Sequence, residues 1–286
     1  MGCRRDVRMV TLSSAVFNSK TTLLGQNGIE ARKNYEYDPY IQFILSRELK
    51  MRASIIIPAH NEEKYIKNTL EAAVHQSFPS YFEVIVVDNA STDNTFKVAN
   101  SFENVKVVRE EKKGVQFARE RGRHEAKGEI LAYLDADSIP HENWLKNGIA
   151  YFSQPDVVGV SGPYDYYDEK PFLRFVSFLF QKVFFRAVHF IVQDVLHKAG
   201  VMLGGNAFIK ASAMEKIGGF NTSIVFYGDD TDTDRRLATV GKVLFKNDVI
   251  VKSSARRLKE MNILKVTFIY ILNFIWVVVF KRPFSR

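Results

Sequence analysis

Two carboxylates one residue apart, Asp135 and Asp137, are the residues of this 286-residue sequence that most directly predict chemistry. They follow an unbroken apolar run, Ile130–Leu134, which is typical of a strand buried on both faces of a sheet. In open parallel sheets, ligands bind beyond the carboxyl ends of the strands. Mg²⁺ is commonly held there by one or two carboxylates together with substrate phosphates. The pair therefore predicts a site for a divalent cation, Mg²⁺ or Mn²⁺, and a phosphate-bearing ligand.

Polar residues also follow two earlier predicted strands, at what should be the same edge of the sheet. Pro58–Asn61 follow the first strand, and Asp88 follows the second. Each group precedes a predicted helix, whose N-terminus carries partial positive charge and favours phosphate. Asp and Asn are common in turns, so for Asp88 alone the turn and the functional interpretations are balanced. Three such strand ends together favour function.

A predicted helix near the C-terminal end opens with four aspartates: Asp229, Asp230, Asp232 and Asp234. Acids stabilise a first helical turn, and Asp232 can pair with Arg236 four residues later, so Asp232 and Asp234 are interpreted as structural. Asp229 and Asp230 stand at the tip of the helix. A carboxylate held there can accept a proton from a hydroxyl, which is the role of a general base.

Adjacent arginines, Arg256 and Arg257, follow the last predicted strand. Two guanidinium groups can grip a diphosphate in bidentate fashion, although spacing alone slightly favours a solvated basic loop. The sequence has no Gly-x-x-x-x-Gly-Lys-Ser/Thr loop and no Gly-x-Gly-x-x-Gly turn after the first strand. A bound nucleotide would therefore be held by carboxylates, a metal and scattered base contacts.

These residues need a scaffold that brings strand ends together, and the apolar periodicity supplies one. Strands and helices alternate from residue 53 to residue 134, which predicts an α/β fold with a mostly parallel central sheet, helices on both faces and right-handed crossovers. The predicted strands cover Ala53–Ile57, Phe82–Val87, Val105–Val108, Ile130–Leu134, Val157–Ser161, Gly204–Ile209, Val243–Lys246 and Val249–Lys252. The predicted helices cover Glu62–Gln76 with Asn61 as N-cap, Ser91 or Thr92 to Phe102, Gly114–Lys127, Ser212–Ile217 and Gly228–Val240.

The overall composition is that of a globular protein, with 46% hydrophobic residues, and the net charge is +8. Such a charge favours nucleotide phosphates, anionic lipid or nucleic acid as partners. The basic residues cluster near apolar helices instead of forming a stripe with stacking aromatics, so we expect no nucleic-acid partner. The single cysteine, Cys3, allows no internal disulfide and agrees with a reducing compartment.

Two segments raise the question of membrane attachment. Met261–Phe280 has about the ~20 residues that cross a bilayer, but polar residues interrupt it and basic residues flank both ends. Symmetric basic flanks fit a helix that lies at the interface next to anionic lipid. The aromatic, basic segment Pro171–Gly200 predicts one or two amphipathic helices, and its part 172–198 can join that helix at the interface. We expect a location at the cytoplasmic face of a membrane, peripheral or C-terminally anchored. The alternative is that both segments cover the core of the catalytic domain.

The ordered motifs resemble those of the family 2 glycosyltransferases over about residues 53–260: Ile55–Glu62, Val86–Asp93, Gly114–Gly122, Leu134–Ser138 and Gly204–Phe220. The resemblance implies the nucleotide-diphospho-sugar transferase (GT-A) fold and inverting transfer from a nucleotide sugar. It also implies a donor pocket flanked by Pro58, Ala59 and Glu62. The Gln-x-x-Arg-Trp motif of processive synthases is absent, and Ser-Ala-Arg-Arg stands at about its place.

Carried over residue by residue, the resemblance implies roles for the polar positions. Asp88 would read the nucleobase, usually uracil, and Arg119 would approach the donor. Asp137 would be the direct metal ligand of an Asp-x-Asp pair, while Asp135 would contact the metal, a metal-bound water or the ribose. Gly205 and Asn206 would form the loop before the acceptor. Asp230 would be the base, with Asp229 in place of the more common Glu.

We therefore expect an irregular N-terminal extension over 1–50, a GT-A catalytic domain over 51–260, and an apolar membrane-associated helix with a basic tail over 261–286. The expected reaction is inverting transfer of a sugar from a nucleotide-diphosphate donor, UDP-type favoured, to a hydroxyl of a lipid-linked or polysaccharide acceptor of the cell envelope. A nucleotidyltransferase is an alternative, although it normally carries a Gly-rich, basic loop after its first strand. A non-catalytic nucleotide- or glycan-binding relative is another, against which the intact acids count.

Overall fold

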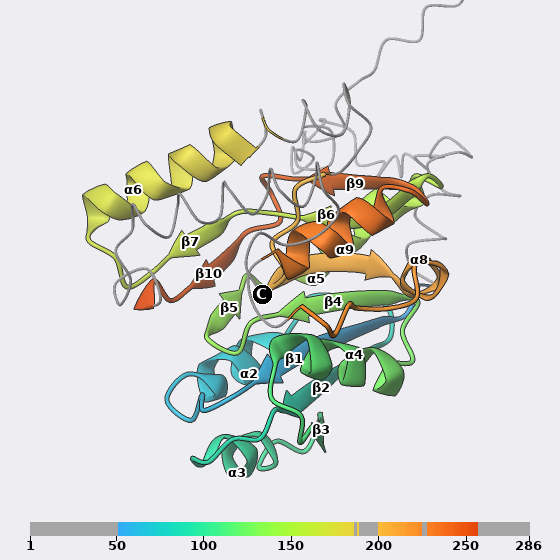
Figure 1. The fold of residues 1–286 in the computed structure, drawn as a ribbon. Coiled ribbons are helices and arrows are strands. Elements are labelled where there is room, and N and C mark those ends of the chain that lie inside the picture. The colour runs from blue at the N-terminus through green and yellow to red at the C-terminus, as the bar shows by residue number, and fades with distance from the viewer. Residues whose placement is uncertain (1–50, 186–187, 189–199, 225–227, 257–286) are drawn as a thin grey trace, which may run out of the picture. The chain divides into compact units, whose positions relative to one another are not determined.

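A seven-stranded sheet forms the centre of the structure, and most of its strands are the buried apolar runs of the sequence (Figure 1). In spatial order the strands are β3 (Val105–Arg109), β2 (Phe82–Asp88), β1 (Ala53–Ala59), β4 (Ile130–Leu134), β8 (Asn206–Lys210), β6 (Val157–Ser161) and β9 (Lys242–Phe245). Strands β1 to β4 are mutually parallel, β8 is antiparallel to both β4 and β6, and β9 is parallel to β6. The predicted mostly parallel sheet is confirmed.

This computed structural model describes residues 51–185, 188, 200–224 and 228–256. The expected extension over 1–50, the apolar segment Met261–Phe280 and Arg257 lie outside the described residues. Within the described part of the chain, no helix is long and apolar enough to cross a membrane.

Side chains of the sheet alternate between two apolar clusters, one on each face. In β1, Ile55 and Ile57 pack with α2 (Ile66–Val74) and α5 (Trp144–Ala150), whereas Ile56 faces the opposite cluster. That second face is covered by α4 (Val115–Glu125), α8 (Ala211–Lys216) and α9 (Asp229–Leu237). Each fully buried isoleucine stabilises the fold by about 1.5–3 kcal/mol, which is why these runs form the centre.

A second, three-stranded sheet was not predicted as such. Its strands are β5 (Ser138–Pro140), β10 (Val251–Ser253) and β7 (Tyr164–Tyr166). Strand β10 is the predicted strand 249–252 shifted by one or two residues. The other two strands have three residues each and no apolar run, so only pairing with β10 defines them. Helix α5 and the 3₁₀ turn η1 (Tyr151–Ser153) were also missed.

Two predicted helix starts were wrong, because the residues expected to cap them tie two loops together. Helix α2 begins at Ile66, and Asn61 adopts a left-handed φ of 56° and accepts a hydrogen bond from the Thr92 amide at 2.8 Å. The Asn61 amide donates to Ser91 Oγ at 3.1 Å. Helix α3 (Thr95–Ala99) likewise begins three or four residues later than expected. The loops after β1 and β2 are thereby bonded to each other.

The aromatic segment after β7 forms α6 (Pro171–Phe180), which continues as the π-helical turn η2 (Gln181–Phe185). Figure 1 shows α6 lying along β7, next to the small sheet. The helical prediction for this segment is confirmed as far as residue 185, and the remainder up to residue 199 lies outside the described residues except for 188.

One fully buried side chain, Asn206, connects four parts of the fold. The Trp144 indole N–H donates to Asn206 Oδ1 at 2.9 Å, and Asn206 Nδ2 donates to the carbonyls of Gly162 and Val249 at 2.9 and 2.8 Å. The Ser161 hydroxyl donates to the Asn206 carbonyl at 2.8 Å. Helix α5, the end of β6 and the chain before β10 therefore all meet at the start of β8.

We expect Asn206→Ala to lower the free energy of unfolding by about 2–4 kcal/mol, because it leaves a buried indole N–H and two buried carbonyls without partners. Urea unfolding followed by circular dichroism measures this. The matched control is Asn147→Ala, which removes a single hydrogen bond, 3.2 Å long, to the Asp248 carbonyl at an exposed position. Equal losses from the two substitutions would contradict the connecting role of Asn206.

Candidate active site

The strand register brings the predicted site residues to one edge of the central sheet. Ala59 at the end of β1 is paired with Asp88 at the end of β2. Because β8 runs antiparallel to β4, the loop that enters β8 meets the chain that leaves β4. The Asp135 amide accordingly donates to the Gly205 carbonyl at 3.2 Å. These residues therefore share one edge of the sheet, as the parallel order of the strands predicts.

Asp88, the last residue of β2, is buried at this edge, with 3% of its surface exposed. Its Oδ1 atom has no hydrogen-bond partner among the described residues, and the nearest cation to Oδ2 is Arg109, whose Nε lies 3.9 Å away. A buried carboxylate oxygen without a donor is costly unless a ligand supplies one. The position suits an acceptor for a nucleobase N–H, which stays a prediction.

A buried ion-pair cluster forms where α4 meets the start of α9. Arg119 Nη1 lies 3.0 Å from Asp229 Oδ2 and 2.7 Å from Asp230 Oδ1. The amide of Gly204 donates to Asp230 Oδ2 at 2.9 Å, and Gln116 donates to Asp229. Both oxygens of Asp230 are therefore held, while 35% of its side chain stays exposed, compared with 16% for Asp229.

The charges in this cluster shift one another's pKa values. Burial alone would lower the pKa of Arg119, but the carboxylates of Asp230, Asp229 and Asp135 raise it above its ordinary value. Burial raises the pKa of Asp229 to about 6, with a further increase from Asp230 and an opposing effect of Arg119. Arg119 thus stays charged, and Asp229 takes up a proton closer to neutral pH than an ordinary aspartate does.

Two glycines allow the β8 loop to approach the acids closely. A Cβ atom at Gly205 would overlap the Asp135 carboxylate, and one at Gly204 would overlap both Asp230 and Arg119. The loop therefore presents backbone instead of side chains to the site. This arrangement explains the Gly-Gly-Asn sequence. The two glycines let the loop backbone approach the acids, and the buried side chain of Asn206 holds the loop in place by hydrogen bonds.

A second ion-pair cluster surrounds Asp137. Arg256 Nε lies 3.1 Å from Asp137 Oδ2, and a terminal nitrogen of Arg256 contacts Glu62 Oε1. Its guanidinium also lies over the Tyr65 ring, 4.6 Å from the ring centroid. Burial opposes the charge, but Glu62 and Asp137 raise the pKa of Arg256. Arg256 follows strand β10, and β10 pairs with β5, which begins directly after Asp137. This pairing brings Arg256 next to Asp137.

The carboxylates of Asp135 and Asp137 are the type of ligand that binds a divalent cation. Asp135 and Asp137 are hard oxygen donors, and Asp137 already faces a positive group, Arg256. Glu62 Oε2 is buried nearby with no hydrogen-bond partner among the described residues. The described residues contain no group of three or more His, Cys, Asp or Glu side chains arranged to hold a metal by themselves. A cation here would complete its coordination with diphosphate oxygens and water.

Tyr164 is a site residue that the sequence analysis missed. Its hydroxyl lies 3.4 Å from Asp135 Oδ2, where it donates a hydrogen bond. Burial, and secondarily Asp135, raise the pKa of Tyr164 well above its ordinary value, so it remains a donor. The residue lies on the three-residue strand β7, which has no periodicity to reveal it. The Gly162-Pro163 dipeptide before it, which is typical of turns and loops, was the one available signal.

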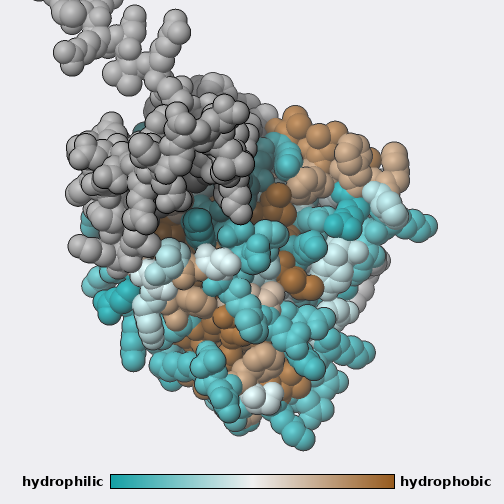
Figure 2. Space-filling model, turned by 180° about the vertical axis from the view of Figure 1, so that it is seen from behind, coloured by the Kyte–Doolittle hydropathy of each residue, from teal (hydrophilic) through white to brown (hydrophobic). Residues whose placement is uncertain are grey.

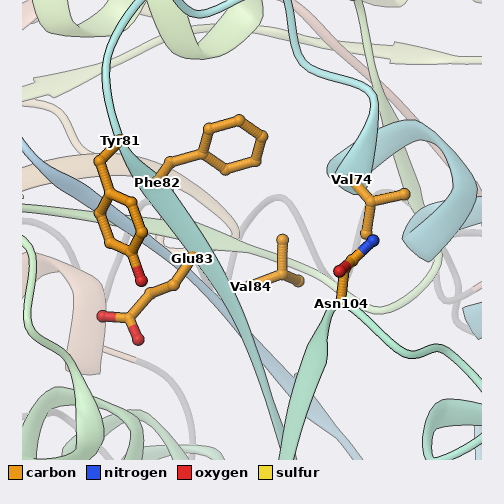
Figure 3. A pocket seen from close by; sticks show the side chains of 6 residues that line it. All are labelled: Val74, Tyr81, Phe82, Glu83, Val84 and Asn104. Atoms are coloured by element: carbon orange, nitrogen blue, oxygen red, sulfur yellow. The ribbon is translucent and has the colours of Figure 1, made fainter.

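Not every candidate residue faces the site. The Asn206 amide is occupied by internal partners, so it positions the loop instead of reaching an acceptor. Figure 3 shows a separate hollow of about 360 Å³, lined by Val74, Tyr81, Phe82, Glu83, Val84 and Asn104. It lies at the amino-terminal ends of β2 and β3, the edge of the sheet opposite the candidate site, and has none of the predicted residues.

The family model for glycosyl transferase family 2 matches residues 54–218, more than half of the chain. The chain is a family 2 glycosyltransferase. Glycosyltransferase AglE of Haloferax volcanii is 31% identical over 217 residues, which cover 73% of this chain and 68% of AglE. A glucuronosyltransferase of Methanococcus voltae, whose name specifies a dolichyl N-acetyl-α-D-glucosaminyl phosphate, is 35% identical over 38% of each chain.

Solved structures show the same fold at lower identity. Mannosyltransferase PcManGT from Pyrobaculum calidifontis, in complex with GDP-Man and Mn²⁺, has a TM-score of 0.57 and 23% identity over 76% of this chain and 64% of its own. Glucosyl-3-phosphoglycerate synthase from Mycobacterium tuberculosis has a TM-score of 0.57 and 17% identity over 86% and 85%. The glycosyltransferase therefore has the GT-A fold. The family model and the relatives favour glycosyl transfer over the nucleotidyltransferase alternative.

A buried acid on α9 of this glycosyltransferase makes its stability depend on pH. Burial raises the pKa of Asp234 to about 8, against the hydrogen bond that its Oδ2 accepts from the Gly200 amide at 2.8 Å. The folded state thus binds this proton more tightly than the unfolded chain, whose Asp pKa is about 4. We expect the free energy of unfolding to lose this contribution as the pH rises from about 4 to about 8.

Urea unfolding across that pH range measures the effect, and Asp234→Asn should become more stable relative to the unsubstituted protein as the pH rises. Asp232→Asn on the same helix is the control. Asp232 pairs with Arg235 and Arg236 at 3.0 and 2.8 Å, so its substitution should destabilise instead. A constant difference between Asp234→Asn and the unsubstituted protein at every pH would contradict the assignment.

Arg119 should control the acidic side of the pH–activity profile. Arg119→Met keeps the approximate volume but removes the charge that lowers the pKa of Asp229. We expect sugar transfer to fall by about 100-fold, because the acid pair loses its position, and the acidic limb of the profile to move to higher pH. Arg123→Met on the same helix, which breaks a pair with Glu120, is the control and should leave the profile in place. An unshifted limb for Arg119→Met would refute this role.

Proposed function

We propose that this glycosyltransferase moves a sugar from a nucleoside-diphosphate donor to a hydroxyl of a lipid-linked or polysaccharide acceptor, with inversion at the anomeric carbon. The observation that carries the proposal is the held but exposed carboxylate of Asp230. It stands across the Gly204–Gly205 loop from Asp135, on the same edge as Asp88. One side of the edge thus offers a proton acceptor, and the other offers groups for a nucleotide.

Asp230 is proposed as the general base. Arg119 and the Gly204 amide hold its two oxygens, and its exposure leaves room for an incoming hydroxyl. The acceptor oxygen would attack the anomeric carbon as Asp230 takes its proton, and the bond from that carbon to the diphosphate oxygen would break. Asp229 is the less suited of the pair, because only 16% of its side chain is exposed, compared with 35% for Asp230.

The departing diphosphate would be stabilised by the Asp137 cluster. Asp137, with Asp135, would hold a divalent cation, which neutralises negative charge on the leaving group when bound. Arg256 would contact the diphosphate directly, since its guanidinium already stands beside Asp137. Arg257 is proposed as a further diphosphate contact from its sequence position. Pro58, Ala59 and Glu62 border this half of the site.

The donor is proposed to be of the UDP type. The support is Asp88, a buried acceptor at the end of β2 that a uracil N–H would satisfy. The lipid-linked or polysaccharide acceptor is supported by relatives, because the Methanococcus enzyme is named for a dolichyl phosphate-linked sugar and the TarS proteins of Staphylococcus aureus for poly(ribitol-phosphate). With such an acceptor, we place the protein at the cytoplasmic face of a membrane and expect no nucleic-acid partner.

Release of nucleoside diphosphate from a panel of nucleotide sugars, with and without Mn²⁺, tests the reaction. We expect Asp230→Asn to lower transfer by about 100- to 10,000-fold, because the substituted amide cannot accept the proton. Asp137→Ala should lower it comparably and remove the dependence on Mn²⁺. Product analysis by NMR reports the anomeric configuration.

The control is Asp156→Asn, which breaks an exposed pair with Lys242 and should leave turnover unchanged. Full turnover by Asp230→Asn would exclude Asp230 as the base. Turnover that does not respond to Mn²⁺ or to a chelator would exclude the metal part of the proposal while leaving the base assignment standing.

A further inference from the structure

Helix α6 is attached to the rest of the protein by its polar side. Arg174 makes a two-point contact with Asp165 of β7, with both nitrogen–oxygen distances at 2.5 Å. Gln181 is buried and bonds both the amide and the carbonyl of Tyr164, each at 3.0 Å. Ser177 lies between them on the same side, since residues three and four apart share one helix face. Apart from the partly buried Phe178, the inward face of this helix is therefore hydrophilic.

The opposite side of the helix carries the exposed apolar residues. We call this the outer face of α6 and η2, and it is made by Phe172, Leu173, Phe175, Val176, Leu179 and Val183. Phe172 is 75% exposed, and Phe175 and Val183 are 63% exposed. Of the large apolar side chains that are exposed in the described part of the chain, all but Tyr81 lie in residues 172–183. Figure 2 shows apolar surface gathered at this end of the molecule.

This arrangement is the reverse of a helix that packs on a water-soluble protein. Such a helix turns its apolar stripe to the core and its polar residues to water. Here none of the α6 residues is buried, and an ion pair of α6 and amide hydrogen bonds of η2 hold the segment, together with one ring contact between Phe185 of η2 and Phe245. A contiguous apolar surface with a polar attachment marks an interaction site whose partner is itself apolar.

The charges around the outer face indicate which apolar partner it meets. Residues 171–185 contain no acidic side chain, while Lys170 precedes the helix and Lys182 follows it. Of the two acids before Lys170, Asp168 and Glu169, Asp168 is bonded to Ser254. Lys182 Nζ lies 4.3 Å from the centroid of the Phe178 ring, so the ammonium sits at the border of the aromatic surface. Aromatic and aliphatic residues bordered by lysines are typical of helices that lie in the interface of an anionic bilayer.

We propose that the outer face of α6 and η2 docks on the surface of an anionic lipid bilayer. The inference deepens the proposed function and rests on it for the identity of the acceptor. Strand β7, to which the polar side of α6 is bonded, also carries Tyr164, the hydrogen-bond partner of Asp135. The docked helix would therefore hold the catalytic edge beside the membrane surface, where the sugar of a lipid-linked acceptor is found.

An environment-sensitive fluorophore on the outer face tests the docking in the full chain. The single native cysteine is removed by Cys3→Ser, and Phe175→Cys provides the attachment point. The matched control is Tyr81→Cys, because Tyr81 is a large apolar residue outside α6 and η2 that is also exposed, at 57%. Vesicles of phosphatidylcholine with phosphatidylglycerol are added, and spin-labelled lipids serve as quenchers.

We expect a blue shift and lipid quenching at position 175 and neither at position 81, with a weaker response to phosphatidylcholine alone. No change at 175 on addition of anionic vesicles would overturn the proposal. An environment at 175 that is already apolar before vesicles are added, and that stays unchanged with them, would show that another part of this chain or a second copy covers the face. That result also overturns lipid docking.

A second set of variants separates this proposal from the proposed reaction. The combined substitution Phe172→Gln, Phe175→Gln and Leu179→Gln keeps good helix formers and should weaken binding to anionic vesicles by at least about tenfold. Release of nucleoside diphosphate with a soluble acceptor sugar should stay unchanged, because no catalytic residue is altered. Unchanged vesicle binding would refute the docking face. Vesicle binding without transfer by the unsubstituted protein would instead refute the proposed function.

Discussion

The buried guanidinium of Arg119 is the interaction on which the geometry of the site depends. A charge taken out of water costs several kcal/mol unless opposite charges and hydrogen bonds compensate it. Asp229 and Asp230 provide that compensation from a helix more than a hundred residues later in the chain. The start of α9 must therefore stay against α4, and the Gly204 amide then finds the second oxygen of Asp230. The same attraction that stabilises the fold sets the orientation of the acid pair.

The edge of the sheet consequently has two halves with separate electrostatic centres. On one side Arg119 is shared between two acids, and on the other Arg256 is shared between Asp137 and Glu62. Asp135 and Tyr164 stand between the two halves. Each arginine pairs with acids from distant parts of the chain, so neither half exists before the chain has folded.

The sequence predicted the parts of the fold that depend on long apolar runs. Strands such as β1 and β4 are buried on both faces, and their alternation with helices determines the parallel order and the shared edge. The sequence could not predict β5 and β7, because these three-residue strands are defined by their pairing with β10, which was itself predicted with slightly different bounds. For the same reason Tyr164 was missed, and the pairing of Arg119 with Asp230 was not foreseen. Asn61 was misassigned because a cap residue and a loop-tying residue have the same polar side chain.

The bonded loops after β1 and β2 have a thermodynamic consequence for ligand binding. Amides of the first loop donate to Ser91, Thr95 and Asp93 of the second, so the two loops form one rigid rim. Ordering a loop costs about 1–2 kcal/mol of backbone entropy per residue. Here that cost is met when the protein folds and not when a ligand binds. For the proposed nucleotide donor, the free energy of binding on this side can therefore go into selectivity, since a pre-organised rim rejects a base whose donors do not match it.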